Sequence, residues 1–160
     1  MGYLVAIEGI DGSGKGTQAK RLLARLKAGG LRSALLSFPR YDATFFGKKV
    51  GEYLNGAYGP LGQVHPFFAA LLFAGDRFES RALLADELAA NDVVVLDRYV
   101  ASNIAHQAAR LESAERKRLI EAIEHLEFEL YQVPRPDLVV LLDVSVASAQ
   151  RLIATKPSRS

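Results

Sequence analysis

A glycine-rich segment near the N-terminus contains the residue types that bind phosphate. It reads GIDGSGK over residues 9–15 and ends at Lys15. Glycines allow successive backbone N–H groups to turn toward phosphate oxygens, and the lysine adds a positive charge at the same place. The strict Walker A pattern continues with Ser or Thr to bind magnesium, whereas this chain has Gly16 followed by Thr17. The segment therefore predicts a phosphate-binding loop, with a plain glycine turn as the alternative, and the pattern leaves the hydroxyl for magnesium unassigned.

A second group of reactive side chains follows the apolar run at residues 93–96. This run leads directly into Asp97-Arg98-Tyr99, in the manner of a Walker B strand. A carboxylate at the end of a buried strand beside a phosphate loop orients magnesium, directly or through water. Arg98 would then face the transferred phosphoryl group. Buried strands with an acidic end are also common without a metal, so this prediction depends on the phosphate loop.

Two further arginines allow more than one interpretation. Arg77 comes four residues after Phe73, so the two side chains share one helical face. In one interpretation the ring stacks on a base and the guanidinium bonds the carbonyl edge of that base. In the other, the two side chains pack in the core and the arginine extends its charged end toward solvent. Arg40, in the segment at 38–41, lies either beside the phosphate loop or in an ordinary surface turn.

Hydrophobic patterns predict the elements that position these groups. Strands are predicted over residues 3–7, 33–38, 93–96 and 138–142, the last of them buried. Helices are predicted from the loop to Gly29-Gly30, over 44–55, from 66, over 101–110, over 113–131 after a Ser113 cap, and from 145. In the helix at 113–131 one face is apolar (residues 119, 120, 123, 126 and 130), and the charges are assigned to a solvated face. This alternation predicts an α/β fold with a mostly parallel sheet covered by helices on both faces.

Composition restricts the class of protein. The chain has 160 residues, of which 49% are hydrophobic and 24% charged, which predicts one globular domain over residues 1–160. A net charge of +2 gives no reason to expect nucleic-acid binding, and the absence of cysteine excludes disulfides. The apolar run at 67–75 is far shorter than the ~20 residues of a membrane span. No signal peptide and no histidine cluster are present, so we expect a cytoplasmic enzyme without membrane or zinc sites.

Four segments, at residues 9–18, 38–40, 72–77 and 97–103, resemble thymidylate kinases in order and spacing. The resemblance covers essentially the whole chain and implies the P-loop nucleoside monophosphate kinase fold. It implies transfer of the γ-phosphoryl group of ATP to the 5′-phosphate of dTMP, with Mg²⁺, by a homodimer. Glycine at position 12 is typical of the bacterial members, which supply a catalytic arginine from a mobile lid.

The resemblance also implies a role for individual residues. It assigns catalysis to Lys15, Arg98, Asp11 and the lid arginine Arg159. It places ATP on Gly12, Ser13, Gly14, Lys15, Gly16, Thr17 and Arg151, and Mg²⁺ on Thr17, Asp97 and Asp11. It places dTMP on Asp11, Phe38, Pro39, Arg40, Phe73, Arg77, Arg98, Tyr99, Ser102, Asn103, His106 and Gln107. In this set Arg40 and Arg98 hold the acceptor phosphate, Phe73 stacks on thymine, and Arg77 and Asn103 bond its polar edges.

The chain departs from the family pattern at two places. His106 occupies a position where many relatives have a tyrosine or phenylalanine that helps to exclude a 2′-hydroxyl. The histidine either fills the same space as a tolerated aromatic substitute or weakens the discrimination against ribonucleotides. A lid segment begins near residue 151 and is cut off at 160, so the rest of the lid and the C-terminal strand of the fold are expected to be absent. A kinase for another nucleoside monophosphate and a catalytically impaired nucleotide-binding fragment stay open as alternatives. A GTP-binding switch is disfavoured because its Asn-Lys-x-Asp guanine reader is missing.

Overall fold

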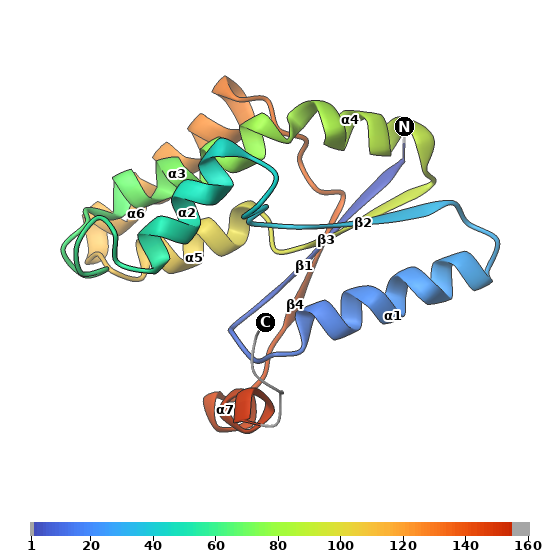
Figure 1. Cartoon of the computed structure of the whole chain (residues 1–160), viewed down its shortest axis with the longest axis horizontal. Helices are drawn as coiled ribbons and strands as arrows, with labels where there is room; N and C mark the ends of the chain where they lie inside the picture. The colour runs from blue at the N-terminus through green and yellow to red at the C-terminus, as the bar shows by residue number, and fades with distance from the viewer. Residues whose placement is uncertain (1, 155–160) are drawn as a thin grey trace. The chain divides into compact units, whose positions relative to one another are not determined.

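The computed structural model describes residues 2–154, which form two compact units (Figure 1). The first unit contains residues 2–36, 87–99 and 136–154, and the second contains residues 37–86 and 100–135. The chain passes between the units at four points, one of which lies within helix α4 (Arg81–Ala90). No helix within the described residues is long and apolar enough to cross a membrane.

The first unit is built on a four-stranded sheet. Its strands are β1 (Tyr3–Gly9), β2 (Ser33–Ser37), β3 (Val93–Asp97) and β4 (Leu138–Leu142), in the order β2-β3-β1-β4. β1 runs parallel to both of its neighbours, with Ile7 opposite Asp97 and Gly9 opposite Leu142. The carboxyl ends of these three strands therefore meet at one edge of the sheet, and the predicted parallel α/β architecture is confirmed.

Helix α1 (Lys15–Ala28) packs on β1 and β3. Ala19 is fully buried against Ile7 and Val95, and Leu22 and Leu26 extend the same contact. The helical spacing of these residues is what the sequence pattern predicts. Because α1 is held against the two central strands, its first turn is fixed beside the carboxyl ends of those strands.

Strand β4 forms as predicted, but its predicted burial is wrong. The exposed fractions of Leu138, Val139 and Leu141 are 46%, 47% and 67%. An apolar run predicts a strand from its local sequence, whereas burial depends on the position of that strand in the sheet. β4 is one of the two outermost strands of the described sheet, and much of its side-chain surface reaches solvent. It is followed by α7 (Val146–Ala154), which Ser145 caps by accepting the Ser148 N–H at 3.2 Å.

The second unit is helical and is centred on α3 (Pro66–Glu79), which contacts four other helices. These are α2 (Phe45–Leu54), α5 (Val100–Ala108), α6 (Ser113–Glu124) and the π-helical η1 (His125–Leu130). Local signals explain two of the helix starts. Thr44 caps α2 by accepting the Gly47 N–H at 2.8 Å, and Pro66 occupies the first turn of α3, where its missing N–H is not needed.

The helix predicted over 113–131 differs from the structure at both ends. Ser113 is its first residue and Glu112 is the N-cap, so the predicted serine cap is wrong. From His125 the chain continues as a π-helix, whose wider turns change which side chains face inward. Glu127, which the sequence pattern assigned to solvent, is fully buried, and Leu130, which it assigned to the apolar face, is 61% exposed.

Candidate phosphate and base sites

The phosphate loop connects β1 to α1 and depends on glycine for its shape. Gly12 and Gly14 have positive φ angles of 82° and 88°, in the left-handed region that favours glycine. A Cβ atom on Gly12 would also lie 2.5 Å from the carbonyl oxygen of Ala149. Gly14 is the N-cap of α1 and provides no side-chain cap, so the first-turn N–H groups keep their capacity to bind an anion.

Lys15 lies over this loop rather than in solvent. Its Nζ donates hydrogen bonds to the carbonyl oxygens of Gly9 at 2.8 Å and Ile10 at 2.7 Å, and only 6% of the residue is exposed. Burial lowers the pKa of Lys15, and the nearby charge of Arg98 lowers it further, against the raising effect of Asp11 and other carboxylates. The loop thus holds a poorly hydrated cation, which gains from the arrival of a phosphate.

Ser13 adds an unsatisfied donor and acceptor to the same loop. Its Oγ is buried and has no hydrogen-bond partner among the described residues. A buried hydroxyl without a partner is unfavourable by about 1–3 kcal/mol. A phosphate oxygen in the loop would satisfy this hydroxyl, so Ser13 fits the predicted ATP site.

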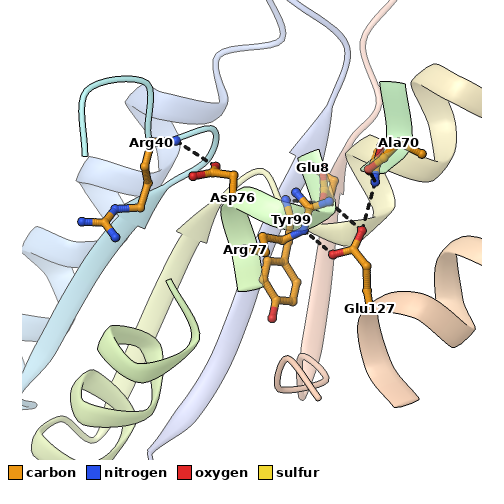
Figure 2. A network of polar contacts seen from close by, with 8 residues as sticks. Glu8, Arg40, Ala70, Asp76, Arg77, Tyr99 and Glu127 are labelled. Atoms are coloured by element: carbon orange, nitrogen blue, oxygen red, sulfur yellow. Dashed lines mark hydrogen bonds and ion pairs between the residues drawn. The ribbon is translucent and has the colours of Figure 1, made fainter. Parts of the chain in front are cut away.

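Arg98 enters the loop region from the end of β3. Its φ angle is 68°, a left-handed conformation that is unfavourable for a residue with a side chain. The backbone N–H of Arg98 donates to the Ile7 carbonyl at 3.0 Å, and its guanidinium pairs with the Asp11 carboxylate. The next residue, Tyr99, is held by its N–H, which donates to Glu8 Oε1 at 2.8 Å (Figure 2). Buried Glu8 is therefore a support of this segment that sequence reasoning did not identify.

Asp97 explains why glycine follows the loop lysine. A Cβ atom on Gly16 would lie 3.0 Å from Asp97 Oδ2, so a serine or threonine there would crowd this carboxylate. Asp97 therefore lies against the first turn of α1, and Thr17 is exposed on the same turn. Residues 2–154 contain no group of three or more His, Cys, Asp or Glu side chains suited to a metal. The predicted set of Thr17, Asp97 and Asp11 still fits Mg²⁺, because this ion prefers oxygen ligands and keeps several water or phosphate oxygens.

The second unit contains a buried polar cluster around Arg77. The guanidinium forms a two-point ion pair with Glu127, in which Nε donates to Oε2 and Nη2 donates to Oε1 at 2.6 Å (Figure 2). Asn103 Nδ2 donates to the same Oε1 at 3.0 Å and to the Ala70 carbonyl at 3.1 Å. The structure thus brings the two predicted base-reading residues, Arg77 and Asn103, onto one carboxylate.

Arg40 is fixed by a second buried carboxylate of the same unit. Its backbone N–H donates to Asp76 Oδ2 at 2.9 Å (Figure 2), and its Nη1 donates to Ser80 Oγ at 3.1 Å. The other oxygen of Asp76 accepts the Thr44 hydroxyl. Asp76 therefore anchors the segment before α2 to α3.

The remaining predicted dTMP residues of this unit have mixed environments. The Phe73 ring packs edge-on against Tyr53, with 6.4 Å between the ring centres. Gln107 is buried and accepts a long contact of 3.5 Å from Arg110, whose other nitrogen binds the Leu61 and Val64 carbonyls. Phe38 is buried, Pro39 and Ser102 are half-buried, and His106 is exposed.

The structure describes one of the two predicted lid arginines. Arg151 is exposed on α7, where its Nη2 donates to Ser148 Oγ at 3.1 Å. Arg159 lies outside the described residues. Of the predicted site residues in the first unit, Asp11, Lys15 and Arg98 lie together at the phosphate loop. Asp97 lies against the first turn of α1.

Sequence reasoning missed three buried carboxylates, those of Glu8, Asp76 and Glu127. A signal existed for two of them. Glu8 interrupts an apolar strand, and Asp76 lies in an otherwise apolar helix next to an arginine, so both break their local pattern. Glu127 lies among charged neighbours in a segment that reads as an ordinary amphipathic helix, and nothing in the local sequence marks it.

A family model, related sequences and a solved structure all match this chain to thymidylate kinases. A model of the thymidylate kinase family matches residues 7–159. The chain is 39% identical over 146 residues to the thymidylate kinase of Mycobacterium tuberculosis strain H37Rv, covering 91% of this chain and 68% of that protein. It is 31% identical over 150 residues to the human thymidylate kinase, covering 94% and 65%. The solved structure of thymidylate kinase from Candida albicans superposes with a TM-score of 0.72 at 30% identity, covering 94% of this chain and 66% of that one. The chain thus spans about two thirds of the length of these relatives.

Proposed function

The chain belongs to the thymidylate kinase family, and we propose that it transfers the γ-phosphoryl group of ATP to the 5′-phosphate of dTMP, giving dTDP and ADP for dTTP synthesis. Members of this family are nucleoside monophosphate kinases, a class of phosphotransferase. The observation that carries the proposal is the phosphate loop, in which a desolvated Lys15 lies over two loop carbonyls beside Arg98.

The residues of the first unit suit phosphoryl transfer through charge and alignment. The second pKa of an acceptor phosphate is about 6, so its attacking oxygen is largely ionised at neutral pH and needs no general base. Lys15, with the loop N–H groups, neutralises the donor phosphates, and Arg98 neutralises the acceptor phosphate. Asp11 holds Arg98 in the ligand-free protein and exchanges that contact for phosphate when substrate binds.

Magnesium belongs to this proposal as a partner of ATP. Asp97, Asp11 and Thr17 are the residues that would hold it, together with phosphate and water oxygens. When bound, the ion neutralises charge on the phosphates. Arg151 and Arg159 are assigned to ATP from the family resemblance, Arg151 to the adenine and Arg159 to the transferred group.

The second unit contains the residues proposed to bind the thymine and sugar. Phe73 offers a ring for stacking, Arg77 offers guanidinium donors for a carbonyl, and Asn103 offers an amide oxygen for an N–H group. Arg40 adds a cation for the acceptor phosphate. The other residues proposed to bind dTMP are Phe38, Pro39, Ser102, His106 and Gln107 of this unit and Tyr99 of the first unit.

An assay of ADP release with different acceptors tests the proposed function. We expect ADP and dTDP to form with dTMP, and turnover with dCMP, dAMP and dGMP to be much slower. The Lys15→Ala variant should lose at least about 10²-fold in kcat, because it loses a preorganised charge at the transferred group. Its thermal midpoint should stay near that of the wild type. Equal rates with all acceptors, or normal turnover of a folded Lys15→Ala variant, would contradict the proposal.

We propose that the enzyme works as a homodimer in the cytoplasm. Support for dimerisation comes from the apolar side chains that α3 and η1 expose, above all Phe68 and Leu130, which are 62% and 61% exposed. Light scattering should give twice the 17.4 kDa chain mass, and Phe68→Asp should shift it toward one chain mass. Fractionation of the source cells tests the cytoplasmic location.

A further inference from the structure

Glu127 is a fully buried carboxylate, with 0% of the residue exposed to solvent. Burying an ionised group is strongly unfavourable unless it is paired and hydrogen-bonded, so such residues usually have a specific task. Three N–H groups satisfy this carboxylate. Nε and Nη2 of Arg77 and Nδ2 of Asn103 all donate to its oxygens (Figure 2).

The carboxylate determines which way the Asn103 amide points. A carboxylate only accepts hydrogen bonds, and so does the Ala70 carbonyl on the other side of Nδ2. Two acceptors at one end of the amide require its NH2 group there, which leaves Oδ1 at the opposite end. Asn103 Oδ1 is buried and has no hydrogen-bond partner among the described residues. This oxygen is satisfied only when a donor from outside the described cluster reaches it.

The same carboxylate also places Arg77 beside the Asn103 amide. Arg77 Nη2 and Asn103 Nδ2 share Glu127 Oε1, so the guanidinium and the amide lie next to each other. The pair combines a cationic donor with a neutral acceptor. Thymine and uracil present the complementary edge, a carbonyl next to an N–H group. Cytosine presents an amino group next to an unprotonated nitrogen, which places donor against donor and acceptor against acceptor.

We propose that Glu127 is a positioning residue for base selection, which fixes Asn103 as an acceptor and Arg77 as a donor and so selects a base with adjacent carbonyl and N–H groups. This inference rests on the proposed function, because it concerns the base of the acceptor nucleotide. Glu127 acts through Arg77 and Asn103, whose N–H groups it binds.

The Glu127→Gln variant tests this role with little change in volume. A glutamine replaces one acceptor oxygen by an NH2 group, so either amide orientation sets that group against an N–H of Arg77 or of Asn103. We expect KM for dTMP to rise about tenfold or more, the size expected when a charged hydrogen bond is lost. KM for ATP should stay unchanged, and the preference for dTMP over dCMP, as the ratio of their kcat/KM values, should fall about tenfold.

The matched control is Glu129→Gln, two residues along the same segment. Glu129 forms an exposed ion pair with Arg135, so this variant removes the same charge without touching the buried cluster. It should keep the wild-type selectivity. A folded Glu127→Gln variant with the wild-type KM for dTMP and the wild-type preference would overturn the proposal, as would the same loss in the control.

A measurement of hydrogen exchange in the wild-type protein does not depend on turnover. The side-chain NH2 of Asn103, assigned by its loss in Asn103→Asp, should exchange slowly with solvent in the ligand-free protein because both of its acceptors are buried. Exchange as fast as that of an exposed amide would overturn the role of Glu127, even if dTMP kinase activity is confirmed. Slow exchange in a protein that fails to phosphorylate dTMP would instead support the arrangement and reject the proposed function.

Discussion

Arg98 combines an unfavourable backbone conformation with a side chain suited to a phosphate. Its φ angle of 68° lies in the left-handed region, where a side chain crowds the backbone. The register of the sheet explains why the conformation persists. The N–H of Arg98 binds the Ile7 carbonyl and that of Tyr99 binds Glu8, so the chain must turn sharply between two fixed points. Backbone strain of this kind is often found at functional sites.

Replacing Arg98 by glycine and by alanine separates strain from function. Both variants should lose most turnover, because neither has a guanidinium. Glycine tolerates the left-handed conformation, so Arg98→Gly should be more stable than Arg98→Ala by about 0.5–1 kcal/mol, after allowing for the greater freedom of glycine in the unfolded chain. Urea unfolding measures the difference. If the alanine variant is equally or more stable, position 98 is not strained.

The lowered pKa of Lys15 predicts a proton uptake on nucleotide binding. A bound phosphate favours the charged lysine, so the pKa of Lys15 rises again in the complex. Between the lowered pKa of the free protein and the raised pKa of the complex, binding takes up a proton, and ATP affinity should fall as pH rises through this window. Calorimetry in two buffers of different ionisation enthalpy measures the uptake. Lys15→Arg is the control, because arginine stays protonated and should show less uptake.

At the scale of elements, the packing of α2 on α3 depends on a glycine. A Cβ atom on Gly75 of α3 would lie 2.5 Å from Cγ of the Phe46 ring, which is too close for any real contact. Gly51 of α2 is also helical, but its Cβ would meet only a Tyr41 ring carbon at 3.5 Å, an ordinary contact distance. The two positions share a residue type and a backbone conformation, and differ in the space around them.

Alanine substitutions at these two glycines should have opposite effects. Gly51→Ala should stabilise the protein by up to about 1 kcal/mol through helix propensity. Gly75→Ala should destabilise it by about 1–3 kcal/mol, because the Phe46 ring must move. Chemical denaturation of both variants gives the comparison. A stabilised Gly75→Ala variant would show that the α2–α3 contact adapts at no cost.

The elements also show what sequence alone can predict. The segment from β1 through the loop to α1 is contiguous, so its strand, glycines, lysine and helix are all visible in one stretch of sequence. The Arg77–Glu127 pair is not, because its members are separated by 50 residues and η1 departs from α-helical spacing. Gly16 is a similar case, since its close approach to Asp97 joins two distant segments. The placement of Asp97 and Arg98 beside the loop was predicted because a strand end marks them in the sequence, whereas the partner of Arg77 was missed because nothing in the local sequence marks Glu127.

For the whole molecule, ligand binding should appear as a selective gain in thermal stability. A ligand at 100 times its Kd stabilises the folded state by about 2.7 kcal/mol, which for a chain of this size raises the thermal midpoint by about 5–10 °C. We expect dTMP to give this shift, and dCMP, dAMP and dGMP to give much less at the same concentration. Equal shifts with all of these nucleotides would mean that the base is not read, and no shift would mean that this chain does not bind the acceptor.

Strand β4 has a consequence for the behaviour of the chain in solution. It reads LVVLL, it is one of the two outermost strands of the described sheet, and three of its apolar side chains are largely exposed. An apolar outer strand is a template on which an extended segment of another molecule can add as a further strand. Association through this edge would be open-ended, unlike a closed helical dimer interface. A lysine in place of one of the exposed apolar side chains of β4 would act as a gatekeeper against such growth.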